Sequence, residues 1–72
     1  MTLNAIKIGE KIRKLRGSES RESFARKIGV SPSALSMYET GKRIPRDEIK
    51  LTIAEKTGKS VEDIFFSEIV HN

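Results

Sequence analysis

The chain has 72 residues, 36% hydrophobic and 33% charged, which fits one small domain and is too apolar for a disordered tail and too polar for a membrane protein. It has no cysteine, and its one histidine, His71, is the next-to-last residue, which argues against disulfides, thiolate or histidine catalysis and metal sites with several Cys or His ligands. The net charge of +4 is uneven: residues 1–46 carry +7 (11 Lys and Arg, 4 Asp and Glu) and residues 47–72 carry −3 (3 and 6), as expected where one face meets a polyanion.

The first expected helix runs from about Leu3 to Arg16, and Gly17 ends it. Its apolar residues recur mostly at three- and four-residue spacing, which predicts one buried stripe made of Leu3, Ile6, Ile8, Ile12 and Leu15. The second runs from about Arg21 to Ile28 with Ser20 as its N-cap, and Gly29 stops it. Its expected buried residues are Phe24, Ala25 and Ile28.

The third expected helix opens with Ser31 as N-cap and Pro32 in the first turn, where a missing N–H costs no hydrogen bond. It continues to Thr40, stops at Gly41 and turns Leu35 and Tyr38 inward. A basic loop, KRIPR, follows at residues 42–46.

The fourth expected helix spans about Asp47 to Thr57 and ends at Gly58, and acidic residues in its first turn suit the helix dipole. Its apolar residues, Ile49, Leu51, Ile53 and Ala54, do not define one narrow stripe. The fifth starts at Ser60, which forms a capping-box pattern with Asp63, and continues to about residue 70. No run of about 18 apolar residues and no signal-peptide core is present, so we expect a soluble, cytoplasmic, nucleoid-associated protein without a membrane partner.

The short joint between the second and third helices carries most of the functional information. Two short helices joined by three or four residues that include a glycine are typical of a helix-turn-helix, here at about residues 21–40, although an ordinary helical hairpin has the same spacing. Gly29 supplies the left-handed backbone for a sharp exit, Val30 plugs the angle between the helices, and Ala25 lets them approach closely.

Several segments resemble the Cro/CI-type (XRE-type) helix-turn-helix regulators, over about residues 6–66. They are IGEKIRKLR (8–16), SRESFARKIG (20–29), VSPSALSMYETGKRIP (30–45), and Ile53-Ala54 through SVEDIF (60–65). The most specific stretch is Ser36-x-x-Glu39-x-Gly41-Lys42-Arg43-x-Pro45.

The resemblance implies an all-α, lambda-repressor-like fold, a compact bundle of five short helices forming one domain over residues 1–72. It also implies sequence-specific, usually dimeric, DNA binding by a bacterial or phage repressor, and a pairing of Arg16 with Glu39. This sequence departs from the family pattern in having Arg21 where Gln usually contacts a phosphate, and Glu19 where a buried aliphatic residue is common. Asp47, Lys50 and Thr57 likewise stand where the fourth helix usually shows apolar residues.

Roles follow from how such a motif meets the major groove. The outward residues at the start of the third helix are expected to contact bases: Pro32, Ser33, Ser36 and Met37. None of them is Arg, Asn or Gln, so base discrimination should be modest and DNA shape should contribute. The expected phosphate contacts come from the second helix start and the basic loop: Arg21, Lys42, Arg43 and Arg46.

The C-terminal segment has more apolar residues than the end of a small domain can easily hide. Ile64 and Phe65 are expected in the core, whereas Phe66, Ile69 and Val70 either form a homodimer interface or fold back over the bundle. We therefore expect a homodimeric regulator of transcription, most simply a repressor, that binds an operator in double-stranded DNA without a cofactor or metal and could have a regulatory protein partner. The alternative is an antitoxin or another protein-binding module on the same fold, and an enzyme has no motif to support it.

Overall fold

Polar side chains cap the amino ends of the first three helices in the computed structural model, which describes residues 4–66. Asn4, Ser20 and Ser31 each accept a hydrogen bond of 3.0 Å from the backbone N–H three residues on. These caps satisfy N–H groups that have no partner inside a helix. The helices that they begin are α1 (Ala5–Arg16), α2 (Arg21–Ile28) and α3 (Pro32–Glu39).

The second half of the fold consists of α4 (Asp47–Thr57) and a short π-helix, η1 (Glu62–Phe66). The predicted bounds of α2 and α4 are confirmed, and α3 ends one residue before the predicted Thr40, which is its C-cap. The fifth element is a single wide turn within the described residues rather than an α-helix, although Ser60 caps it as predicted by accepting a bond of 3.0 Å from the Asp63 N–H. The described residues form the predicted all-α fold.

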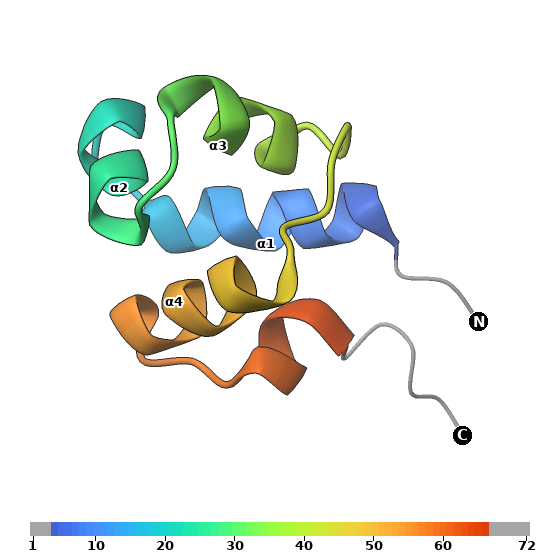
Figure 1. The fold of residues 1–72 in the computed structure, drawn as a ribbon. Helices are drawn as coiled ribbons and strands as arrows, with labels where there is room; N and C mark the ends of the chain where they lie inside the picture. Colours follow the sequence, from blue (N-terminus) through green and yellow to red (C-terminus); the bar gives the residue numbers. More distant parts are fainter. Residues whose placement is uncertain (1–3, 67–72) are drawn as a thin grey trace.

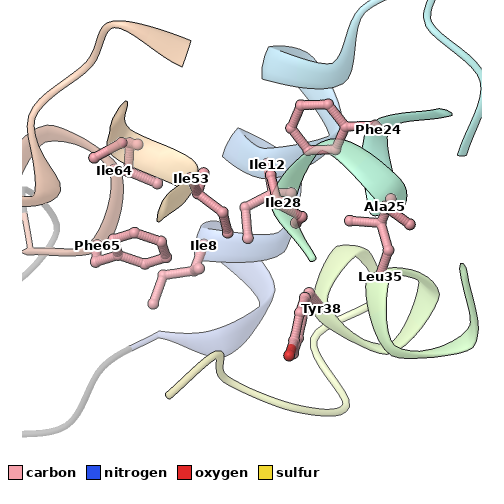
Figure 2. Packing of buried hydrophobic residues seen from close by; sticks show 11 residues of the cluster. Ile8, Ile12, Phe24, Ala25, Ile28, Leu35, Tyr38, Ile53, Ile64 and Phe65 are labelled. Atoms are coloured by element: carbon pink, nitrogen blue, oxygen red, sulfur yellow. The ribbon is translucent and has the colours of Figure 1, made fainter. Parts of the chain in front are cut away.

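Helix α1 passes through the middle of the domain, with α3 on one side and α4 and η1 on the other, and α2 lies beside its carboxyl end and packs against both α3 and α4 (Figure 1). Every element contributes to one core, shown in Figure 2. Its buried residues are Ile8, Ile12, Phe24, Ala25, Ile28, Leu35, Tyr38, Ile53, Ala54, Ile64 and Phe65. The inward positions predicted for the second, third and fifth helices are therefore confirmed.

Two apolar side chains do not join the core. Ile6 was expected in the buried stripe of the first helix, but it is 62% exposed, as is Leu51 on α4. Each precedes a buried isoleucine by two residues, Ile8 and Ile53, and residues two apart on a helix lie about 200° apart around its axis. The expectation for Ile6 was wrong because the helix cannot turn both side chains inward. Leu3 lies outside the described residues.

Within residues 4–66, every helix is too short, or too polar, to cross a bilayer.

Candidate nucleic-acid interface

The turn between α2 and α3 is held by backbone hydrogen bonds that need a left-handed residue. Gly29 has φ 79° and donates its N–H to the Arg26 carbonyl at 3.2 Å, and Val30 donates to the Ala25 carbonyl at 2.9 Å. A side chain at this φ would be strained, so glycine suits the position. Ala25 is fully buried and Val30 packs against the core, which confirms the geometry expected of a helix-turn-helix.

Helix α3 divides into a buried side and a solvent side. Leu35 and Tyr38 point into the core (Figure 2). The four residues expected to contact bases lie at the surface: two are exposed and two are half-buried, and they are Pro32, Ser33, Ser36 and Met37. Met37 belongs neither to the core cluster nor to the side chains packed against it, so it is available at the surface of α3.

The basic loop after α3 is anchored by its apolar residues and presents its charged ones. Pro45 is fully buried and Ile44 half-buried, whereas Lys42, Arg43 and Arg46 are exposed. Backbone bonds from Gly41 to Tyr38 (3.2 Å) and from Lys42 to Met37 (2.9 Å) fold the loop back onto the end of α3. In the part of the chain that the structure describes, none of the three cations has an ion pair.

A nearly buried ion pair joins α1 to the end of α3. Arg16 donates from Nε to Glu39 Oε2 at 2.7 Å and from Nη2 to Oε1 at 3.2 Å, and the two side chains are only 9% and 4% exposed. The third donor of the guanidinium, Nη1, bonds the Glu19 carbonyl at 2.8 Å. The hydrogen bond to Glu39 raises the pKa of Arg16. The pairing implied by the family resemblance is confirmed, and it fixes the carboxyl end of α3.

Arg21 differs from the other cations expected at phosphates because it already has a partner. Its Nη2 lies 3.4 Å from Oε1 of Glu39, so Arg16 and Arg21 share one carboxylate. The Arg21 side chain remains 44% exposed. The guanidinium therefore leans from the start of α2 toward the end of α3 while one side stays open to solvent.

Glu19 stabilises the start of α2. Its carboxylate accepts from Lys27 Nζ at 2.8 Å and from Ser23 Oγ at 2.7 Å. Those two hydrogen bonds lower the pKa of Glu19. Sequence reasoning noted Glu19 only as a departure from an aliphatic position. Glu19 precedes the N-cap of α2, so no spacing rule within a helix indicated its contact with Ser23.

Two further features were not predicted. An added Cβ at Gly9 would lie 2.5 Å from the Tyr38 carbonyl oxygen and 2.6 Å from that of Glu39, so α1 approaches the backbone of α3 directly at this residue. Lys50, one of the polar substitutions on α4, is 8% exposed. Its Nζ lies 3.6 Å from Asp47 Oδ1 and 5.8 and 5.3 Å from the ring centres of Phe65 and Phe66.

The residues expected at a dimer interface are only partly described. Phe66 is half-buried and packs against the core, beside Lys50. Ile69 and Val70 lie outside the described residues.

Comparison with known proteins identifies the architecture. A family model described as helix-turn-helix matches residues 10–64. The fold is similar to the restriction-modification controller protein C.AhdI from Aeromonas hydrophila, with 25% identity and a TM-score of 0.75 over 85% of this chain and 96% of that one. It is also similar to the clp gene regulator ClgR from C. glutamicum, with 26% identity and a TM-score of 0.72 over 89% of this chain and 86% of that one.

A third structure, the SOS-response transcriptional repressor LexA from Eubacterium rectale, matches with a TM-score of 0.81 over 96% of this chain and 76% of that one. At 18% identity, this likeness concerns the fold alone. No curated protein matched the chain.

Proposed function

The chain belongs to the XRE-type helix-turn-helix family of DNA-binding regulators, and we propose that it represses transcription by binding a two-fold symmetric operator as a homodimer. The observation that carries this proposal is the solvent face of α3. It presents short polar side chains and one methionine, and the three exposed cations of the loop that follows have no ion pair among residues 4–66.

The contacts proposed for bases are weak individually. Ser33 and Ser36 can donate to or accept from several base edges, and Met37 can contact a thymine methyl group. Pro32 adds an apolar contact at the start of the helix. Since none of these side chains pairs with one base in a bidentate way, shape readout should contribute to sequence preference.

The contacts proposed for phosphates are stronger and carry no sequence information. Lys42, Arg43 and Arg46 extend from the loop, and Arg21 lies at the amino end of α2, where backbone N–H groups also favour an anion. If each neutralises one phosphate in both copies, about eight phosphates are engaged. The logarithm of the binding constant should then fall with the logarithm of salt concentration with a slope of roughly −7.

Selection of bound sequences from a random duplex pool tests the proposal. The wild type should enrich a symmetric motif, and replacing Ser33, Ser36 and Met37 together by alanine should change or abolish that motif. Arg43→Ala is the matched control: it should weaken all sequences alike and flatten the salt slope by about one or two units per dimer.

Three results would contradict the assignments. An unchanged motif in the triple variant would mean that α3 does not read the groove. A new preference in Arg43→Ala would mean that Arg43 reads bases. No enrichment by the wild type would favour a protein-binding role, such as that of an antitoxin.

A further inference from the structure

Helix α4 presents a large apolar side chain to solvent at the edge of its buried side. Leu51 is 62% exposed, and Ile6 is the only other exposed large hydrophobic residue among residues 4–66. Ile53, two residues after Leu51, is fully buried. The edge of α4 therefore has an exposed apolar side chain that the described part of the chain does not cover.

An open hollow lies beside Leu51. It has a volume of about 350 Å³ and is bordered by Asp47, Lys50, Leu51, Val61 and Phe66. Val61 and Phe66 are half-buried and pack against the core, so the apolar floor is held in place by the fold. Phe66 is the last described residue, and six more residues follow it in the sequence, with Ile69 and Val70 among them. The hollow thus includes Phe66, one of the residues expected at a dimer interface.

The charges around the hollow compensate each other. Asp47 Oδ1 and Lys50 Nζ lie 3.6 Å apart, and the ammonium group is also within 6 Å of the Phe65 and Phe66 ring centres. One positive and one negative group leave the hollow without net charge, so an identical surface can approach it without repulsion between these groups.

The surroundings of Ile6 are different. A Cβ added at Gly41 would lie 2.9 Å from Ile6 Cγ1, so Ile6 sits against the turn that leads into the basic loop. Lys42 follows directly, and Lys7 is the next residue on α1. Two copies meeting at Ile6 would bring these cations together, which would oppose association.

We propose that two copies of the chain meet at Leu51, each placing this side chain in the hollow beside α4 of the other. The proposal rests on the proposed homodimeric function and deepens it by locating the interface. An interface with two-fold symmetry must complement itself, and one projecting side chain next to one hollow meets that requirement. It also leaves the solvent face of α3, across α1 from α4, free for DNA (Figure 1).

Sedimentation equilibrium of the full chain, as wild type, Leu51→Gln and Ile6→Gln, tests the interface. Glutamine is neutral and forms helices well, so neither variant changes the charge presented to DNA or disfavours its helix. Each Leu51 loses its burial in Leu51→Gln, so the dimer should weaken about 100-fold in total. Ile6 is as exposed as Leu51 in the wild type but lies outside the proposed interface, so Ile6→Gln should dimerise as the wild type does. An unchanged helical circular dichroism spectrum shows that each variant is folded.

Leu51→Gln with wild-type self-association would overturn the proposal and leave the DNA-binding function standing. Equal weakening in both variants would overturn it too. If the wild type is monomeric in solution, the same variants are compared on a duplex that carries two half-sites. Cooperative binding by the wild type and by Ile6→Gln, but not by Leu51→Gln, supports the interface. Independent binding of two wild-type copies overturns it, as does no binding by a monomeric wild type. Failure of the pool selection would refute the operator function without affecting the sedimentation comparison.

Discussion

Single carboxylates hold the surface elements of this domain in place. Glu39 accepts hydrogen bonds from Arg16 and Arg21. The nearly buried Arg16 guanidinium also donates to the Glu19 carbonyl in the loop between α1 and α2. Removing one partner from the Arg16–Glu39 ion pair leaves an uncompensated charge, which is far more costly than the net gain from forming the pair. The orientation of α3 therefore depends on the Arg16–Glu39 pair, and neither residue is among those proposed to contact DNA.

Glu19 gives the domain a predictable response to acid. Hydrogen bonds from Lys27 and Ser23 lower its pKa in the folded protein below the ordinary value of 4.5. A carboxyl whose pKa is depressed by folding stabilises the protein fully above its unfolded pKa, and that stabilisation is lost as pH falls through the folded pKa. We expect Glu19→Gln to lower the melting temperature at neutral pH, and the difference from wild type to shrink below about pH 4.5.

Thermal melts followed by circular dichroism from pH 7 downward measure this difference. Glu55→Gln is the control, since Glu55 is exposed on α4 and has no ion pair among the residues that the structure describes. Melting curves of Glu19→Gln that stay parallel to the wild type into the acid range would contradict the assigned contacts.

At the scale of the helices, the sequence predicted where the helices begin better than it predicted how they pack against one another. Ser20, Ser31 and Ser60 indicated where α2, α3 and η1 begin, because an N-cap side chain bonds a backbone N–H that is close to it in sequence. Apolar spacing could not tell which of Ile6 and Ile8 faces the core, since that depends on which other elements cover α1. The same limit applies to the site: the exposed loop cations follow from sequence, whereas the contact between Arg21 and Glu39 depends on how α2 meets α3.

Burial of Lys50 shows a second limit of sequence patterns. Lys50 was noted only as a lysine at a usually apolar position of α4, and the rings of Phe65 and Phe66 and the carboxylate of Asp47 lie beside its ammonium group. These aromatic partners come from η1, more than a dozen residues later. Periodicity within one helix carries no information about such a neighbour.

The junction of α1 and α3 gives a test at the scale of elements. Gly9→Ala should gain about 1 kcal/mol of helix propensity. The added Cβ would lie 2.5 Å from the Tyr38 carbonyl oxygen, which is backbone and cannot turn away. Forcing the helices apart costs about 1–3 kcal/mol, so we expect a net loss of about 1 kcal/mol in the free energy of unfolding. Urea denaturation measures it.

Lys14→Ala, at an exposed position on the same helix, is the control and should change the free energy of unfolding by less than about 0.5 kcal/mol. A more stable Gly9→Ala variant would mean that α1 and α3 do not approach each other as closely as the structure shows.

At the scale of the whole molecule, charge and architecture agree. The segment that carries +7, residues 1–46, includes α1 as well as α2, α3 and the basic loop, and the segment that carries −3 includes α4 and η1. Because α3 and α4 lie on opposite sides of α1 (Figure 1), the side with α3 and the basic loop suits a polyanion and the side with α4 and η1 is left for protein contact. The proposed two-fold dimer uses both sides at once.

This division predicts how the protein should respond to changes in operator spacing. A dimer joined through α4 and the C-terminal segment holds its two α3 helices at a set separation, which for such motifs matches half-sites about 34–36 Å apart, one turn of DNA. Inserting five base pairs turns one half-site to the opposite face of the duplex, and inserting ten restores the face but adds a full turn of distance. Packed helices cannot stretch across that distance, so both insertions should lower affinity about 100-fold, to that of a duplex with one half-site. Fluorescence anisotropy measures the affinity for four duplexes: the original spacing, the two insertions and a single half-site. Full affinity after the ten-base-pair insertion would show that the copies bind independently, and the dimeric mode of operator recognition would then be wrong.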